Sequence, residues 1–129
     1  MINLDDSYAP VPVPTRFVPG ELVTHRKYGY RGVVVDFDAQ CLATEEWYQS
    51  NQTQPAKDQP WYHVLVDQAA HVTYVAQSNL LPDPSGKPIL HPMTNLFFSF
   101  EDGRYLRNDV PWNPGAPPDL QPPPPPPQA

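Results

Sequence analysis

Two stretches decide the fold: HRKYGYRGVVVDFD at residues 25–38 and QPWYHVLVDQAAHVTYVAQSNLL at residues 59–81. The first is rich in β-branched and aromatic residues after its glycines, which predicts a tight turn and then a strand over 32–38. The second predicts strands over 60–67 and 71–76, joined by a hairpin turn. One helical turn over 77–81 is expected to follow and to return Leu80 to the core.

Shorter signals extend this pattern in both directions. Residues 21–26 alternate well enough for a first strand after the Pro19-Gly20 turn. Residues 43–52, ATEEWYQSNQ, contain helix formers without glycine or proline, and Thr44 is suited to cap a short helix. Gly29 and Gly32 bracket Tyr30 and Arg31, so both glycines, like Gly20, are assigned to structural turns, where glycine is needed for a positive φ or for a close approach of backbones.

These elements predict a mainly β fold, a small SH3-like antiparallel β-barrel with one short helix inserted between its second and third strands. A barrel of short strands must bend sharply, and glycines permit that bend. We expect the barrel domain to span residues 17–105. A flexible, proline-rich N-terminal arm would span residues 1–16, and a disordered polyproline tail would span residues 106–129.

Proline sets these boundaries. Four prolines lie between Pro10 and Pro19, and ten lie between Pro111 and Pro127, six of them consecutive at 122–127. Proline lacks the amide donor and has a fixed φ, so such segments form neither helix interiors nor central strands. The C-terminal run is typical of extended polyproline II conformation.

The overall charge limits the classes of partner. The net charge is −6 and the isoelectric point is about 4.9. Proteins that grip nucleic acid usually present a basic face, so the average charge argues against strong nonspecific DNA binding and leaves a local patch open. There is no apolar stretch of membrane-spanning length and no secretory signal pattern, and the single Cys41 cannot form an internal disulfide. These features predict a cytoplasmic protein without a membrane partner.

A basic cluster forms the candidate binding site. Three of the eight Lys and Arg residues fall within six positions, interleaved with aromatic residues. Its members are His25, Arg26, Lys27, Tyr28, Tyr30 and Arg31. On a hairpin tip the cations are able to contact phosphates and the tyrosines to stack on bases. The alternative is a solvated turn whose charges keep one end of the barrel soluble.

No catalytic, metal or cofactor motif emerges. The four histidines lack the short ligand spacings of metal sites. Cys41 has no histidine or acid in a nucleophile motif, and Asp36 and Asp38 fit the acidic rim of a strand. We therefore expect a chain that is not an enzyme and that needs neither a metal nor another cofactor.

The two opening stretches, together with Phe17, Gly20 and Val23, resemble the YccV/HspQ family over roughly residues 16–105. The resemblance implies two binding roles. The first, which we favour, is stress-linked protein quality control as an adaptor or modulator of an ATP-dependent, Lon-type protease, with the protease or a client protein as partner. The second is hemimethylated-DNA binding by the basic hairpin 25–31, which the acidic net charge would keep weak.

The chain departs from its compact relatives at the C-terminal end, where LFFSFEDGRY and the polyproline tail extend it. This departure weakens any direct transfer of partner identity, and a homo-oligomer stays open. The tail would either bind an aromatic groove of a partner or form a disordered end.

The tail assignment yields a prediction. Deleting residues 114–129 is expected to leave the melting temperature within a few degrees of the parent's, because a polyproline segment buries little surface. Thermal denaturation followed by circular dichroism measures this, and a larger drop would show that the tail packs on the domain.

Overall fold

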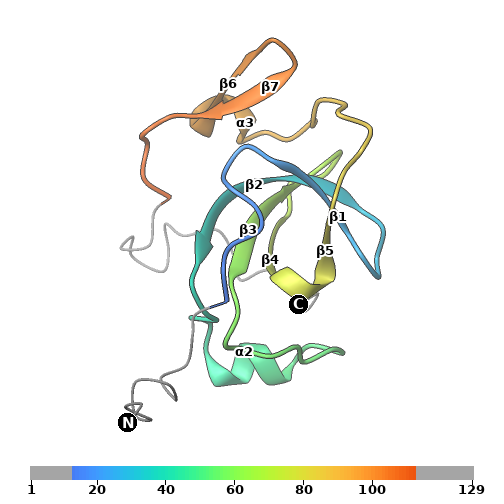
Figure 1. The fold of residues 1–129 in the computed structure, drawn as a ribbon, viewed down its shortest axis with the longest axis vertical. Coiled ribbons are helices and arrows are strands. Elements are labelled where there is room, and N and C mark those ends of the chain that lie inside the picture. Colours follow the sequence, from blue (N-terminus) through green and yellow to red (C-terminus); the bar gives the residue numbers. More distant parts are fainter. Residues whose placement is uncertain (1–12, 113–129) are drawn as a thin grey trace, which may run out of the picture.

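A computed structural model describes residues 13–112, so residues 1–12 of the predicted arm and residues 113–129 of the predicted tail lie outside the described part. The described chain is mainly β, with seven strands in two antiparallel sheets (Figure 1). The strands are β1 (Leu22–His25), β2 (Arg31–Asp38), β3 (Trp61–Val66), β4 (Val72–Ala76), β5 (Leu80–Pro82), β6 (Phe98–Glu101) and β7 (Arg104–Arg107). The helical elements are α2 (Glu45–Gln49), the 3-10 turn η1 (Gln77–Asn79) and α3 (Thr94–Phe97).

The larger sheet has five strands in the order β4-β3-β2-β1-β5, and β6 and β7 form a separate hairpin. The mainly antiparallel β fold, the helix between the second and third strands, and the helical turn before β5 confirm the sequence predictions. In the part of the chain that the structure describes, β4 and β5 are the edges of the sheet and do not pair with each other. Closure into an SH3-like barrel therefore stays a prediction.

Strand β2 is buried on both faces, because Val33, Val34 and Val35 have no exposed surface. Val34 lies in the inner cluster, and Val33 and Val35 lie in a second cluster on the opposite face. This arrangement follows from the pleat, which sends successive side chains to opposite sides of the sheet. The inner cluster consists of Phe17, Val23, Val34, Tyr62, Val64, Val75 and Leu80.

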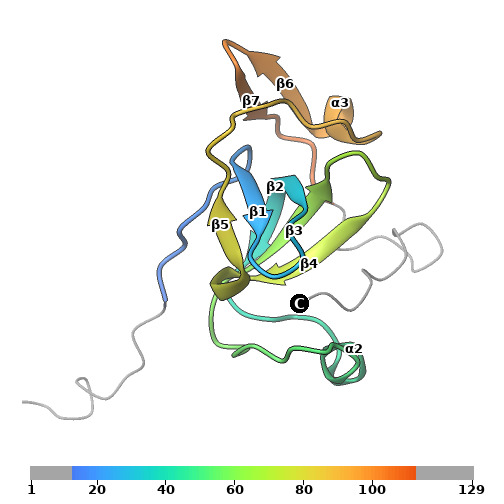
Figure 2. The same ribbon diagram turned by 90° about the vertical axis from the view of Figure 1, so that its right-hand side faces the viewer.

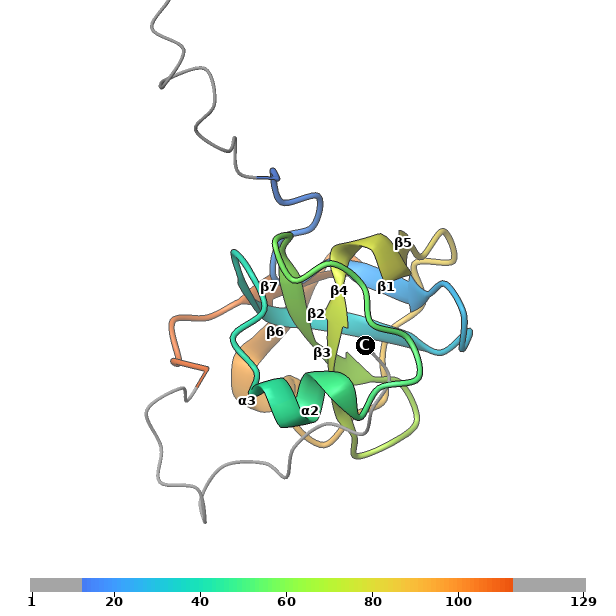
Figure 3. The same cartoon turned by 90° about the horizontal axis from the view of Figure 1, so that it is seen from below.

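Two layers cover the outer face of the sheet. The segment that contains α3 and the β6–β7 hairpin lies over one end and buries Ile89, Phe97 and Phe98 against β2 and β3 (Figure 2). Helix α2 lies at the other end, where Trp47 and Tyr48 pack on Trp61 (Figure 3). Neither α3 nor the β6–β7 hairpin was predicted from the sequence.

A β-bulge fixes the C-terminal layer to the sheet. The register between β2 and β3 shifts between Val34 and Asp36, which leaves Val35 as the extra residue. The carbonyl of Val35 accepts a hydrogen bond of 2.8 Å from Nε of Arg107, and the same guanidinium lies 4.9 Å from the centre of the Phe97 ring. A bulge leaves a backbone group without its ladder partner, and here an arginine from β7 supplies the partner.

The three predicted turn glycines differ in role. Gly20 and Gly29 have positive φ values of 102° and 76°. At Gly20 a Cβ would also lie 2.5 Å from the carbonyl oxygen of Tyr105. Gly32 is not in the turn: it lies within β2, where a Cβ would stand 2.4 Å from Cγ1 of Val64 and 2.6 Å from the carbonyl oxygen of Leu65. The turn assignment of Gly32 is therefore wrong, and of the two expected reasons for a glycine, positive φ and close approach of backbones, close approach applies here.

This close approach predicts the cost of the smallest side chain. Gly32→Ala should lower the melting temperature by roughly 10 °C, because the backbone of β3 cannot withdraw from the new methyl group without loss of about 2 kcal/mol. Gly86→Ala is the comparison for backbone strain without steric overlap, since its φ is 65° and no atom lies within 4 Å of its Cβ position, so it should lose less stability than Gly32→Ala. Equal melting temperatures for the two variants, measured by calorimetry, would contradict the packing argument.

Candidate binding surface at the first hairpin

The predicted basic cluster occupies the connection between β1 and β2. The turn closes through a hydrogen bond from the amide of His25 to the carbonyl of Tyr30, 2.8 Å, and one from the amide of Gly29 to the carbonyl of His25, 2.9 Å. This geometry brings all six candidate residues into one hairpin, but it does not give them the same environment.

His25 belongs to the scaffold of the hairpin, since only 1% of its surface is exposed. Its Nδ1 accepts hydrogen bonds from the amides of Lys27 and Tyr28, at 3.0 and 3.1 Å. The imidazole therefore holds the turn from inside, and its ring is not available to an external phosphate.

Arg31 is also committed to the scaffold. Its guanidinium donates to Oδ2 of Asp83 at 2.8 Å, to Oδ2 of Asp67 at 3.0 Å and to the carbonyl of Lys87 at 2.6 Å. Burial alone would raise the pKa of Asp83, but hydrogen bonds from Arg31 and Ser85 bring that pKa below its usual value. Arg31 thus joins β2 to two loops, and its charge is already neutralised.

Three residues of the cluster face solvent: Arg26, Lys27 and Tyr28. The Tyr28 ring, 41% exposed, lies on the buried His25 ring at 4.6 Å between centroids. The ring of Tyr30 lies 5.2 Å from that of His25, and its hydroxyl donates to Thr73. Burial raises the pKa of Tyr30 to about 12, so this hydroxyl stays protonated. Tyr28 is therefore the outer member of a supported aromatic stack.

The structure adds a residue that the sequence analysis missed. The backbone amide of Arg16 donates to the side chain of Gln77 at 2.9 Å, and the guanidinium of Arg26 reaches the carbonyl of Ser78 at 3.4 Å. Arg16 and Arg26 therefore flank the same turn, η1, and both side chains are exposed. Arg16 lies ten positions before Arg26, on a segment without any cluster of charge, so only the fold could have revealed this proximity.

A second surface lies on the C-terminal layer. Between residues 90 and 106 four apolar side chains are about half exposed or more, although they alternate with the buried residues of this layer: Leu90 (73%), Leu96 (54%), Phe100 (46%) and Leu106 (46%). Phe100 and Leu106 point to opposite faces of the β6–β7 hairpin, because Phe100 pairs with Tyr105 and Leu106 with Ser99, so this layer exposes apolar side chains on more than one side.

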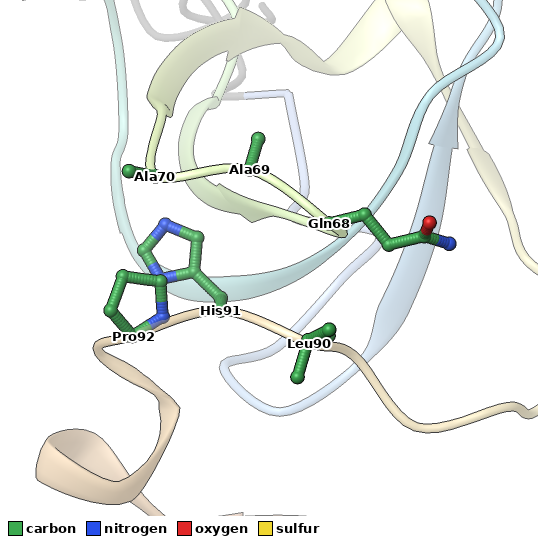
Figure 4. Close-up of a pocket in the computed structure, with 6 residues that line it drawn as sticks. All are labelled: Gln68, Ala69, Ala70, Leu90, His91 and Pro92. Carbon is green, nitrogen blue, oxygen red and sulfur yellow. The ribbon is translucent and has the colours of Figure 1, made fainter.

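A shallow hollow of about 450 Å³ lies beside Leu90, between the β3–β4 turn and the segment before α3 (Figure 4). Its wall includes Ala69, Ala70, His91 and Pro92. Nε2 of His91 donates to the carbonyl of His71 at 2.9 Å, and Nδ1 accepts from the amide of Met93 at 3.1 Å. Burial lowers the pKa of His91, so the hollow has a neutral, fully bonded histidine and a mostly apolar wall.

The ionisable side chains of Asp38 and His63 are engaged in structural contacts. Oδ2 of Asp38 accepts the Tyr74 hydroxyl at 2.6 Å and lies 3.5 Å from Nε2 of His63, whose ring stacks on Tyr74. Burial raises the pKa of Cys41, which disfavours a reactive thiolate. Within residues 13–112 no group of three or more potential ligands is arranged to hold a metal ion, and no helix has the length and hydropathy to cross a bilayer.

The comparison with known proteins decides the family. The family described as "Hemimethylated DNA-binding protein YccV like" matches residues 15–104, which is most of the chain. The chain belongs to this YccV-like family. This confirms the resemblance seen in the sequence, and it places the domain in a family of binding modules.

The YccV-like domain also recurs within larger proteins. The chain is 31% identical over 93 residues to F-box only protein 21 from Homo sapiens, and equally to the Mus musculus and Pongo abelii proteins of that name. The match covers 69% of this chain and 15% of each relative. The YccV-like domain therefore occurs as one part of those proteins.

The Arg31 bridge makes a prediction that separates stability from binding. Arg31→Met should lower the melting temperature by roughly 10 °C at neutral pH, because loss of the cation leaves two partly buried carboxylates unpaired at about 2 kcal/mol. The pKa of Asp83 is lower in the folded state than its ordinary value. Its ionised carboxyl therefore stabilises the fold above the ordinary carboxyl pKa, and this stabilisation is lost on acidification. The parent should therefore lose stability below about pH 4.

The pH dependence of the Arg31→Met variant provides the control for this prediction. In Arg31→Met the acid-induced loss should be smaller than in the parent, because the Asp83 carboxyl no longer has its cationic partner. Melting curves between about pH 7 and pH 3 measure both effects. Identical pH profiles would contradict the assigned bridge.

Proposed function

We propose that this chain is a non-enzymatic protein-binding module, an HspQ-like adaptor that engages client proteins for an ATP-dependent, Lon-type protease during stress. The observation that carries the proposal is the C-terminal layer, where apolar side chains remain exposed beside a buried core. The acidic net charge also supports a protein partner, because it opposes attachment to nucleic acid. We place the module in residues 17–105 and in the cytoplasm.

The family match supports a modular role. Relatives named F-box only protein 21 contain the domain within a much longer chain, as expected for a contact module that works beside other domains. Neither surface of the present domain combines a nucleophile with a general base. The proposal therefore assigns binding and no chemical step to this chain.

Hemimethylated-DNA binding is the second candidate, because the matching family has that description. The exposed side chains of Arg26, Lys27 and Tyr28 support it, and Arg16, whose backbone amide contacts the neighbouring turn η1, is a further exposed cation. Two or three cations make few phosphate contacts, so this binding would be weak at physiological salt. Arg31 and His25 would serve it only by holding the hairpin in shape.

Two assays on matched variants test the ranking. The first variant changes Leu96, Phe100 and Leu106 to serine, and the second changes Arg26 and Lys27 to alanine. Each is compared with the parent in degradation of an unfolded client by a Lon-type protease, and in fluorescence anisotropy with unmethylated, hemimethylated and fully methylated duplexes at two salt concentrations.

We expect the parent to change the client degradation rate, the serine variant to lose that effect, and the alanine variant to keep it. DNA binding should be weak, and its salt slope should fall by about one unit for each cation removed. Tight duplex binding at physiological salt that the alanine variant loses, without an effect on degradation, would reverse the ranking.

A further inference from the structure

Two buried polar side chains, Tyr62 of β3 and Gln77 of η1, bind the backbone of the N-terminal segment, residues 14–17. The Gln77 side chain accepts a hydrogen bond from the amide of Arg16 at 2.9 Å and donates one to the carbonyl of Pro14 at 3.1 Å. The Tyr62 hydroxyl accepts from the amides of Arg16 and Phe17, at 3.1 and 3.4 Å, and donates to Gln77. Gln77 is 4% exposed and Tyr62 has no exposed surface.

Only one side chain of this segment enters the domain. Phe17 is 2% exposed and contacts Tyr62 edge to face, with 5.5 Å between ring centroids. The side chains of residues 13–16 face solvent. The contacts of the segment are therefore one aromatic anchor and a set of hydrogen bonds to groups that every polypeptide carries.

Apart from the aromatic anchor, such a site recognises the backbone conformation of the bound segment and not its amino-acid sequence. One carboxamide contacts a carbonyl and the amide two residues later, which selects an extended segment of any composition. Burial keeps the pKa of Tyr62 above its usual value, so its hydroxyl is available as a donor to Gln77. If the segment left, both polar groups would lose partners and a large cavity would remain, so the site requires an occupant.

We propose that Gln77, Tyr62 and the Phe17 pocket form a receptor for an extended segment that carries an aromatic residue. The chain's own residues 14–17 fill this receptor as a built-in competitor, and an exposed segment of an unfolded client protein replaces them. The identity of the partner rests on the proposed adaptor function. Unfolded chains offer free backbone groups and exposed aromatic side chains, which are the two features that this site recognises.

Competition from the internal segment explains why the parent protein would bind free segments only weakly at this site. A hydrogen-bonded turn over residues 18–21 joins the segment to β1, so its effective concentration is at least in the millimolar range that short flexible connections reach. A free segment with equal contacts must exceed that concentration, unless it gains further contacts elsewhere on the domain. Weakening the internal segment should therefore uncover binding.

The test uses the full chain with Phe17→Ala and a capped synthetic peptide with the sequence of residues 13–18, VPTRFV. The variant should melt well below the parent, and the peptide should raise its melting temperature in a concentration-dependent manner, by roughly 5 °C or more at saturation. The parent should respond only at far higher peptide concentrations.

Two control peptides separate the anchor from backbone recognition. One has alanine in place of phenylalanine, and the other carries an N-methyl group on the arginine amide, which removes the hydrogen bonds to Gln77 and to the Tyr62 hydroxyl. Both should fail to rescue. The variant Arg31→Met controls for nonspecific stabilisation, because it should also melt below the parent but its substitution lies at the bridge to Asp67 and Asp83, outside the receptor.

Each remaining outcome decides the proposal. Absence of rescue, or equal rescue by the N-methylated peptide, overturns it. A mixed dimer between parent and Phe17→Ala chains at micromolar concentration would assign the receptor to a second copy and overturn the client as occupant. If Phe17→Ala does not fold, the same titration is made on Phe17→Leu, which leaves a smaller cavity. Peptide rescue without any effect on proteolysis would retain the receptor and reject only the adaptor function.

Discussion

The burial of strand β2 on both faces is the constraint from which the rest of the structure follows. Val34 needs an inner core, and Val33 and Val35 need an outer one, so a single layer of sheet is not sufficient. The outer cover comes from residues 89–112, and Arg107 attaches it at the bulge of Val35. The burial of β2 also explains Gly32, because β2 and β3 approach each other too closely there for a side chain.

The division of charged residues between scaffold and surface determines what the domain is able to bind. Arg31 forms ion pairs with Asp67 and Asp83, and Arg107 donates hydrogen bonds to backbone carbonyls. The exposed cations that remain beside η1 form a small basic surface in an acidic molecule. The exposed apolar residues of the C-terminal layer lie on a different part of the fold, so the two candidate surfaces are separable by mutation.

The receptor for the N-terminal segment gives the domain a third mode of contact. The other two surfaces are outer faces, whereas this one lies inside the core and uses Tyr62, a residue of the inner cluster. Occupancy of the receptor is therefore coupled to stability: whatever fills it, internal segment or partner, completes the core. A YccV-like module built this way would sense extended polypeptide through its own folding free energy.

The sequence by itself determined the local elements. The β-branched run GVVVDFD, the hairpin after Trp61, and the helix capped by Thr44 all follow from short-range propensity and pattern. The tertiary structure alone decided the rest: that close strand approach and not a turn requires Gly32, that His25 and Arg31 belong to the scaffold, and that Arg16 and Arg26 both contact η1. Burial, ion pairing and backbone approach arise between segments distant in the chain, and no local pattern records them.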